Sequence, residues 1–375
     1  MNILLSNSTD IFGGGEDYVL ILAKYLSLRG HSVWVAALPG HLLLEKCAAA
    51  GIRTIPVDFS GMGRVFSVAS ELRTLLRSHA IDIIHSNANY DRTCAALAAA
   101  FSRTRHVAGI HSAHSIQHNI THYLRNHFAT AHFLADAEAV KKVLMEEDGI
   151  PETRITVVPI GVEDDHRDRS ASSRAAFRSE LGVGTQTLVI GNVARLVPFK
   201  GHRYLLETIA HVVRERTDVF FPIVGDGELL KPLMDQASEL GIERYVRFLG
   251  FRDNLHELYP GFDIYCHSSL ELAAEAFPLA ILRALAGRLP VVSTNVGGIG
   301  LMVEDGVSGF LVQPEDPGSL AESLLKIIRD ERLRNSMGAV SYQLFTRKFH
   351  ASAMAERVEQ IYLGTRVAGP SGERK

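Results

Sequence analysis

Short apolar runs alternate with longer amphipathic segments along most of this chain. In the first half, the apolar runs predict strands at 2–6, 31–38, 53–58, 81–86, 106–110 and 131–136. The segments between them predict helices at about 15–29, 64–78, 91–101, 117–129 and 137–147. The helical period is clearest in 64–78, where one side carries Val65, Phe66, Val68, Leu72, Leu75 and Leu76. Apolar strands joined by helices are typical of a parallel sheet covered on both faces.

The alternation lapses at 162–183, a stretch rich in charge and Ser that we interpret as a linker with a short helix. It restarts with strands at 187–194, 219–225, 245–250, 262–268, 290–295 and 309–314. Helices are predicted at 201–215, 228–240, 278–287 and 317–330, with more helix to about 364.

This pattern predicts an α/β protein with two doubly wound, Rossmann-like domains that face a cleft. The predicted bounds are 1–165 and 166–345, and a C-terminal helix at about 345–365 is expected to pack back onto the first domain. Doubly wound sheets bind ligands beyond the carboxyl ends of their strands, so the loops that follow each strand are the candidate sites.

Composition narrows the function classes. The chain has 375 residues and a net charge of -3, which disfavours general nucleic-acid binding. Residues 1–160 carry 14 acidic and 14 basic side chains, so strong electrostatic adsorption to a membrane is not expected. No apolar run reaches about 18 residues and the N-terminus does not resemble a signal peptide, so we expect a cytoplasmic protein with at most weak peripheral membrane contact. Cys47, Cys94 and Cys266 are far apart and are expected to be buried thiols.

Two strand-to-helix loops could bind an anion. The first, "FGGGEDY" at 12–18, has three consecutive glycines whose backbone N–H groups could approach a phosphate. It does not match G-x-G-x-x-G, which disfavours a dinucleotide oxidoreductase. The second, "GNVARLVPFKGH" at 191–202, places Arg195 and Lys200 on a short loop after a strand, a pair suited to a diphosphate.

Histidines gather after the strand at 106–110. His111 follows that strand directly, where its imidazole could serve as a hydrogen-bond donor or proton carrier. Spacings of four predict one helical stripe of His114, His118 and His122, but no carboxylate or cysteine interleaves them, which disfavours a metal site. The others in this stretch are His127 and His132.

Four motifs occur in a specific order: "GGGED", "GNVARLVPFKG", "IVGDGELL" and "EAFPLAILRALAGRLPVVSTNVGGIGLMVEDGVSGFLV". This ordered set resembles glycosyltransferase family 4 over about residues 1–345. The resemblance implies the GT-B fold and retaining transfer of a sugar from a nucleotide-diphosphate donor. It further implies a glycan or lipid-linked acceptor, as in the synthesis of cell-surface polysaccharide or lipopolysaccharide.

The resemblance also implies roles for four residues. Arg195 and Lys200 match the bases that hold the donor diphosphate, whose charge would stabilise the leaving group. Glu275 matches an acid that contacts hydroxyls of the donor sugar, and His111 matches a histidine that hydrogen-bonds the transferred sugar.

Further residues match the donor-binding parts of the family pattern. Glycines of the first loop would close over the phosphates, and backbone N–H groups at the start of the 278–287 helix would bind sugar or phosphate. Pro278 has no N–H, and Arg252 lies on a loop where the family often meets the base. The set comprises Gly14, Gly15, Arg252, Phe277, Pro278 and Leu279, and Arg283 is expected in the same donor site although its residue type departs from the pattern.

The chain departs from the family pattern at two positions. Arg283 stands eight residues after Glu275, where the family has a second glutamate that accepts hydrogen bonds from ribose. Arginine has only donors, so it cannot make that contact in the same way. Leu301 stands where the family often has another acid.

The resemblance implies no metal and no cofactor apart from the donor, for which a UDP- or GDP-sugar is expected. Two alternatives stay open. The chain could be a catalytically inactive nucleotide-sugar-binding protein, which the replacements at Arg283 and Leu301 favour, or a GT-B epimerase of nucleotide sugars. The oligomeric state does not follow from the sequence.

Overall fold

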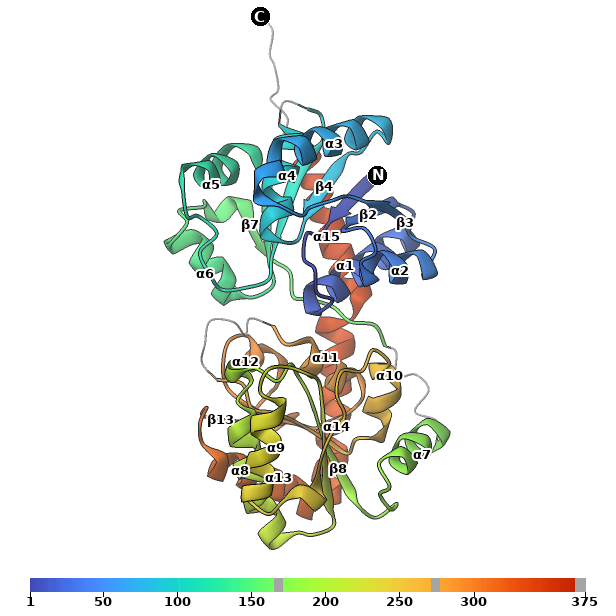
Figure 1. The fold of residues 1–375 in the computed structure, drawn as a ribbon, viewed down its shortest axis with the longest axis vertical. Coiled ribbons are helices and arrows are strands. Elements are labelled where there is room, and N and C mark those ends of the chain that lie inside the picture. Colours follow the sequence, from blue (N-terminus) through green and yellow to red (C-terminus); the bar gives the residue numbers. More distant parts are fainter. Residues whose placement is uncertain (101, 165–170, 271–276, 368–375) are drawn as a thin grey trace, which may run out of the picture. The chain divides into compact units, whose positions relative to one another are not determined.

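A computed structural model describes residues 1–100, 102–164, 171–270 and 277–367. The chain divides into two compact units (Figure 1). Unit 1 comprises residues 1–162 together with the C-terminal segment from Ala351, and unit 2 comprises Glu163–His350.

Unit 1 is built on a seven-stranded parallel sheet with the order β3-β2-β1-β4-β5-β6-β7. Its central pair is β1 (Asn2–Ser6) and β4 (Ile83–Ser86), in which Leu4 pairs with Ile84. The order reverses at this pair, so the chain leaves β1 toward one edge and β4 toward the other. The remaining strands are β2 (Ser32–Ala37), β3 (Arg53–Pro56), β5 (Arg105–Ile110), β6 (His132–Ala135) and β7 (Ile155–Val157).

Helices pack against this sheet. Helix α15 (Ala351–Val367) returns from the end of the chain and packs against α1 and β5. Helix α3 packs against α4 through a core that includes Leu4, Leu72 and Ala95. The other helices are α1 (Gly14–Leu28), α2 (Leu42–Ala49), α3 (Val65–Ser78), α4 (Asn89–Ala99), α5 (Ile120–Leu124) and α6 (Glu138–Glu146).

Unit 2 is built on a six-stranded parallel sheet with the order β10-β9-β8-β11-β12-β13. Its order reverses in the same way, here between β8 and β11. The strands are β8 (Leu188–Val193), β9 (Val219–Val224), β10 (Val246–Phe248), β11 (Ile264–His267), β12 (Val291–Thr294) and β13 (Gly309–Val312).

The helices of unit 2 bury a core that includes Leu206, Ile209, Phe221 and Leu324. Helix α8 packs against α13, and α11 packs against α14. The helices are α7 (Ala171–Glu180), α8 (His202–Glu215), α9 (Leu230–Glu239), α10 (Leu255–Leu258), α11 (Leu279–Ala286), α12 (Ile299–Met302), α13 (Pro317–Arg329) and α14 (Glu331–Leu344).

The predicted fold class of two doubly wound sheets is confirmed. The three cysteines are buried free thiols, as predicted. The prediction for Phe66 was wrong, because its side chain is 81% exposed on α3. The short elements β7, α2, α10 and α12 were not predicted, since they span too few residues for a clear period.

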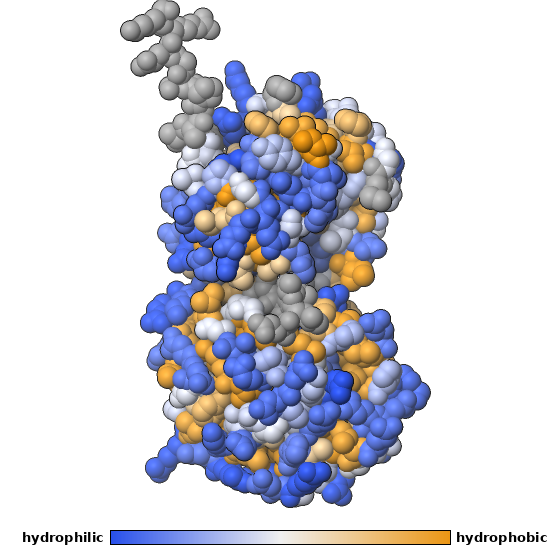
Figure 2. Space-filling view, turned by 90° about the vertical axis from the view of Figure 1, so that its left-hand side faces the viewer, coloured by the Kyte–Doolittle hydropathy of each residue, from blue (hydrophilic) through white to orange (hydrophobic). Residues whose placement is uncertain are grey.

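The surface of unit 1 carries an apolar patch over α5 and the turn that follows it (Figure 2). We call this the α5 patch and define it as Ile120, Tyr123, Leu124 and Phe128, whose exposed fractions range from 38% to 77%. In the described part of the chain, no helix is long and apolar enough to cross a membrane.

Candidate functional site

The glycine loop of unit 1 is held in place by a buried carboxylate. Gly13 is the N-cap of α1, and Glu16 in the first turn accepts a hydrogen bond from the Gly13 N–H at 2.7 Å. The other oxygen of Glu16 accepts hydrogen bonds from Asn7 and Thr9, which follow β1. The first-turn N–H groups of a helix have no helical carbonyl to bind, so the loop presents donors at Gly14 and Gly15.

A second buried carboxylate, Asp91 in α4, joins the loops that follow β1 and β4. It accepts hydrogen bonds from the hydroxyls of Ser6 at 2.7 Å and Ser8 at 3.0 Å. It also accepts hydrogen bonds from the backbone N–H groups of Asn87 and Ala88, both at 3.0 Å. Burial raises the pKa of the Asp91 carboxyl, and these hydrogen bonds oppose the rise. Asp91 thus fixes both loops at the point where the strand order reverses.

His111 lies at the carboxyl end of β5, where the sequence places it. Its Nδ1 is 3.6 Å from Oδ2 of Asp136, which follows β6. Its Nε2 is 3.5 Å from Oδ1 of Asn87, which follows β4. The ring of Tyr18 from α1 packs against the imidazole at 4.6 Å between centroids. Three adjacent strands, β4, β5 and β6, and helix α1 therefore converge on His111.

Gly109 makes room for this convergence. A Cβ atom at Gly109 would lie 2.9 Å from Asn87 Oδ1 and from His85 Nε2, and 3.0 Å from His111 Nε2. His85 lies in β4, and its Nδ1 forms a hydrogen bond of 2.6 Å with the hydroxyl of Tyr362 in α15. Burial, followed by the charge of His111, lowers the pKa of His85 to about 3. His85 is therefore a neutral, structural histidine that ties the C-terminal helix to this edge of unit 1.

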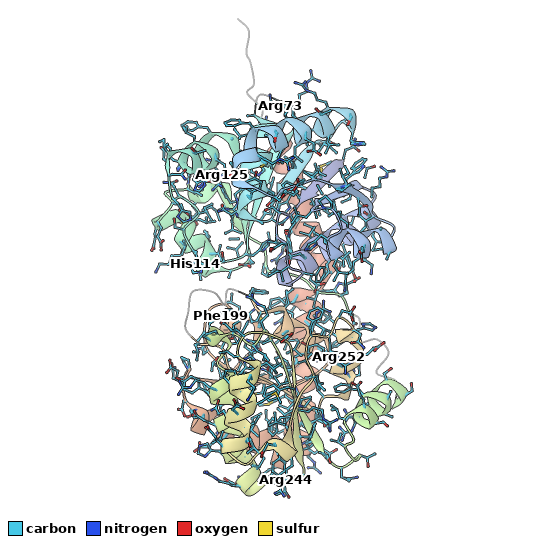
Figure 3. The ribbon with its side chains drawn as sticks, viewed as in Figure 1. Arg73, His114, Arg125, Phe199, Arg244 and Arg252 are labelled. Atoms are coloured by element: carbon cyan, nitrogen blue, oxygen red, sulfur yellow. The ribbon has the colours of Figure 1, made fainter. Side chains whose placement is uncertain are left out.

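In unit 2, Arg195 and Lys200 lie on the loop that follows β8. Both cations contact the ring of Phe199, with Arg195 Cζ at 5.8 Å and Lys200 Nζ at 5.2 Å from its centroid. Phe199 and Arg252 lie at one end of unit 2, opposite Arg244 (Figure 3). Two basic side chains that contact one ring form a surface suited to a diphosphate.

Two glycines hold this loop by close backbone contact. Gly201 has a φ of +65°, and a Cβ there would lie 2.0 Å from the carbonyl oxygen of Ser268. Gly225 has a φ of +141°, and a Cβ there would lie 1.9 Å from the carbonyl oxygen of Ala194. The loops after β8, β9 and β11 are thus pressed together at the reversal of strand order.

A buried hydrogen-bond chain supports the base of the same loop. His202 Nε2 lies 3.1 Å from Asn192 Oδ1, and the Asn192 amide donates to the Cys266 carbonyl at 2.9 Å. Burial lowers the pKa of His202 to about 3, and the positive charges of His267 and Lys200 add to this effect. His202 is therefore neutral at physiological pH.

The other residues predicted to bind the donor lie in α11 or at its start. Pro278 is its N-cap, Phe277 is buried with its ring 5.9 Å from that of Phe349, and Leu279 is the first helical residue. Arg283 lies within α11 and is 9% exposed. Glu275 lies outside the described residues.

Two further positions lie elsewhere in unit 2. Arg252 forms an ion pair with Glu180 at the end of α7. Leu301, the second departure from the family pattern, is 49% exposed on α12.

The predicted histidine stripe was wrong. Helix α5 begins only at Ile120, where Asn119 caps it by accepting a hydrogen bond from the His122 N–H. His114 therefore lies in the preceding loop, while the His118 and His122 rings contact each other at 5.7 Å between centroids. Among the described residues, no group of three or more His, Cys, Asp or Glu side chains could hold a metal ion.

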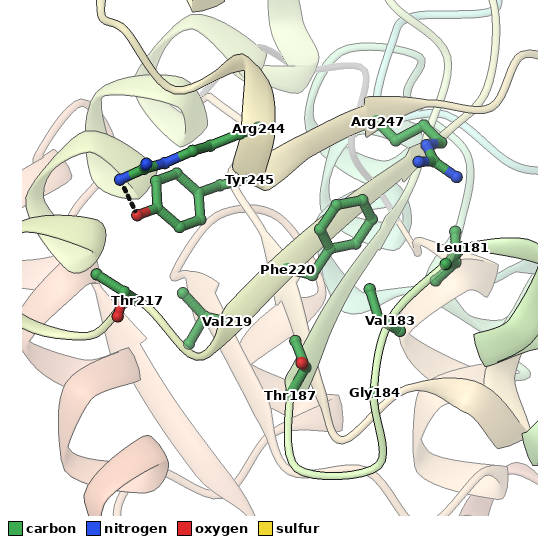
Figure 4. Close-up of a pocket in the computed structure, with 11 residues that line it drawn as sticks. Leu181, Val183, Gly184, Thr187, Thr217, Val219, Phe220, Arg244, Tyr245 and Arg247 are labelled. Carbon is green, nitrogen blue, oxygen red and sulfur yellow. Dashed lines mark hydrogen bonds between the residues drawn. The ribbon is translucent and has the colours of Figure 1, made fainter.

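A shallow pocket in unit 2 lies away from these residues (Figure 4). It opens at the amino ends of β8 and β9, the opposite edge of the sheet from Arg195. Its lining includes Thr187, Thr217, Phe220, Arg244 and Arg247, and Arg244 donates to the Tyr245 hydroxyl at 2.6 Å. The pocket is not part of the candidate site.

Comparison with known proteins gives the family. The model described as "Glycosyltransferase Family 4" matches residues 12–166, and the model described as "Glycosyl transferases group 1" matches residues 173–344. The chain belongs to glycosyltransferase family 4. The second match contains Arg195, Lys200 and Arg283, and the first contains the glycine loop and His111.

Curated relatives of this family 4 chain carry glycosyltransferase names. A D-inositol 3-phosphate glycosyltransferase of Corynebacterium jeikeium is 37% identical over 59% of this chain and 54% of its own length. A phosphatidyl-myo-inositol mannosyltransferase of Mycobacterium leprae is 28% identical over 95% of this chain and 94% of its own length. The chain spans 54–57% of the length of three curated relatives, the Corynebacterium jeikeium protein among them.

Solved structures share the whole fold. The Anabaena protein HepE in complex with UDP has a TM-score of 0.85 and 23% identity, covering 97% of this chain and 100% of its own. A glycosyltransferase of Rickettsia africae has a TM-score of 0.87 and 20% identity, covering 98% and 99%. These likenesses establish the GT-B fold for this family 4 chain.

Several residues of the candidate site were not predicted. Asn87 and Asp136 each directly follow a strand, the same signal that singled out His111. Asp91 and His85 carried no such signal. Asp91 lies inside a helix and His85 inside a strand, and their contacts come from distant parts of the chain.

The crowding at Gly109 gives a stability prediction. We expect Gly109→Ala to destabilise the protein by about 1–3 kcal/mol, because the added methyl group must displace three polar atoms. The control is Gly364→Ala in α15, where a Cβ meets nothing within 4 Å and should be neutral or slightly stabilising. Urea unfolding of both variants tests this. Equal midpoints would contradict the described packing.

The lowered pKa of His202 predicts a loss of stability in acid. The folded pKa of about 3 lies below the unfolded value of 6.5, so the unfolded chain binds the extra proton as the pH falls through that window. This histidine should therefore remove about 2 kcal/mol of unfolding free energy between pH 7 and pH 5. His202→Gln should reduce this dependence, whereas His211→Gln at an exposed position of α8 should not. Urea unfolding at the two pH values measures the difference.

Proposed function

We propose that this chain transfers a sugar, with retention, from a nucleotide-diphosphate sugar to a hydroxyl of a glycan or a lipid-linked acceptor. The observation that carries the proposal is the Arg195 and Lys200 pair after β8, at the reversal of strand order in the family 4 donor unit. The names of the relatives, which are sugar transferases, support the same reaction class.

In the proposed reaction, the bond between the anomeric carbon and the phosphate oxygen breaks. Arg195 and Lys200 would stabilise the negative charge that develops on the leaving diphosphate. The acceptor hydroxyl would attack from the same face and give its proton to a leaving phosphate oxygen. No metal ion or further cofactor enters this proposal, and Gly14 and Gly15 would supply backbone donors to a phosphate.

The donor sugar would be held by His111 and Glu275, and α11 would contribute the N–H groups of Phe277 and Leu279. We expect a UDP- or GDP-sugar as donor, and the structures that share this fold include a protein bound to UDP. Arg283 would donate hydrogen bonds toward the nucleotide, where the family has an acceptor.

A lipid-linked acceptor is favoured by the α5 patch. Residues 111–135 contain no acidic side chain, and Arg125, their only Lys or Arg, is buried. The α5 patch thus presents exposed apolar side chains with histidines between them, which suits shallow contact with a bilayer surface. Among the relatives, the mannosyltransferase of Mycobacterium leprae is named for a phosphatidylinositol acceptor. We propose weak peripheral contact at the inner face of the cell membrane, and a role in cell-surface glycan synthesis.

The roles proposed for Arg195 and Lys200 can be tested by substitution. Lys200→Ala and Arg195→Ala should each lower kcat for nucleotide-sugar turnover by about 10²- to 10³-fold, since each removes a charge from the leaving group. The control is Lys231→Ala, an exposed lysine of α9 that pairs with Asp235. The measurement is release of nucleoside diphosphate from a panel of UDP- and GDP-sugars. Failure of the unaltered protein to bind or turn over any member would refute the proposed function.

Membrane contact through the α5 patch can be tested with lipid vesicles. The protein should co-sediment with lipid vesicles largely independently of salt, because the patch is apolar and nearly uncharged. Phe128→Ser should weaken this partitioning about tenfold or more, since burying one Phe contributes roughly 1.5–3 kcal/mol. The matched control is Phe66→Ser, which removes another highly exposed phenylalanine of unit 1. Equal loss in both variants would show that the α5 patch is not the contact.

A further inference from the structure

The surroundings of His111 contain two residues to which no role has been assigned. We infer that Asp136 and Asn87 are positioning residues for glycosyl transfer, which fix the two edges of the His111 ring so that it acts as a hydrogen-bond donor. The inference rests on the proposed function, because His111 is taken to contact the transferred sugar.

Asp136 is a buried carboxylate whose only ion pair in the described part of the chain is with His111. Its side chain is 3% exposed, and Oδ2 lies 3.6 Å from His111 Nδ1. Asp136 Oδ1 and His111 Nδ1 are both buried without a hydrogen-bond partner among the described residues. A buried carboxylate is costly unless a cation or donor compensates it, and Nδ1 is the donor in reach. A small tightening on substrate binding would complete this hydrogen bond.

Asn87 fixes the opposite edge of the ring. Its amide nitrogen donates to the carbonyl oxygens of Ser6 at 3.1 Å and His85 at 3.3 Å. These two hydrogen bonds determine which way the amide group points, so the atom 3.5 Å from His111 Nε2 is the oxygen Oδ1. Each ring nitrogen of His111 therefore faces an oxygen acceptor.

Two acceptors define the role of the ring. An imidazole that faces oxygen on both edges serves as a donor, because a lone pair on either nitrogen would meet an oxygen lone pair. The ring of Tyr18 packs against the imidazole and restricts its rotation. With Nδ1 directed at Asp136, the Nε2 N–H is the donor that would reach a sugar oxygen, giving up its long 3.5 Å contact with Asn87 Oδ1.

The test measures whether Asp136 acts through His111. Asp136→Asn should lower kcat for sugar transfer about 10²-fold, because a misplaced ring loses its contact. Nucleotide affinity should stay unchanged, since Asp136 contacts none of the residues assigned to the diphosphate, which are Gly14, Gly15, Arg195 and Lys200. Asp136→Glu keeps the carboxylate and should restore part of the rate. The control Asp82→Asn alters a half-buried carboxylate at the opposite end of the same sheet and should leave kcat unchanged.

The decisive comparison is a double-mutant cycle. If Asp136 acts through His111, adding Asp136→Asn to His111→Ala should cause no further loss, whereas a separate structural role would multiply the two losses. If Asp136→Asn does not fold, Asp136→Glu is compared in the same two backgrounds. Multiplied losses, or a kcat equal to that of Asp82→Asn, would overturn the inference while leaving the proposed function intact. A protein that turns over no nucleotide sugar would instead overturn the proposed function.

Discussion

The reversal of strand order at the centre of each sheet is the constraint on which the rest of the structure depends. Parallel strands end at one edge, and at β1 and β4, as at β8 and β11, the chain leaves in opposite directions. Loops on either side of the reversal therefore separate and leave polar groups between them. In unit 1 the loop after β4 carries Asn87, and Glu16 and Asp91 lie in the first turns of the helices that follow these loops. In unit 2 the loop after β8 carries Arg195 and Lys200.

The two units fix their loops by different physical means. In unit 1, the buried carboxylate of Glu16 collects hydrogen bonds within the loop after β1, and that of Asp91 collects them from both sides of the reversal. In unit 2, Gly201 and Gly225 bring backbone directly against backbone, with no room for a side chain. Backbone contact thus fixes the loop of unit 2 without using the side chains of Arg195 and Lys200. This difference is consistent with assigning the diphosphate to unit 2.

The sequence alone was sufficient to predict the fold and part of the candidate site, and the physical reasons can be named. Strands buried on both faces are continuous apolar runs, and residues such as His111 and Arg195 are found by counting from the ends of those runs. The same rule applied to the predicted strand at 81–86 would have found Asn87, whereas Asp136 was counted into the predicted strand at 131–136, and β6 ends one residue earlier. No local pattern indicates Gly109, whose role depends on three side chains from β4 and the strand ends around it. The histidine stripe failed because spacing alone does not show that Asn119 starts the helix late.

The two departures from the family pattern differ in burial, and therefore in their expected effect on stability. Leu301 is half-exposed on the four-residue helix α12, so its replacement of an acid removes a charge from the surface at little cost. Arg283 is nearly buried in α11, between apolar neighbours such as Leu282 and Ala284. A guanidinium in that position needs acceptors around it, because an uncompensated buried charge strongly destabilises a fold. The arginine must therefore be built into the interior of unit 2, whereas Leu301 lies at its surface.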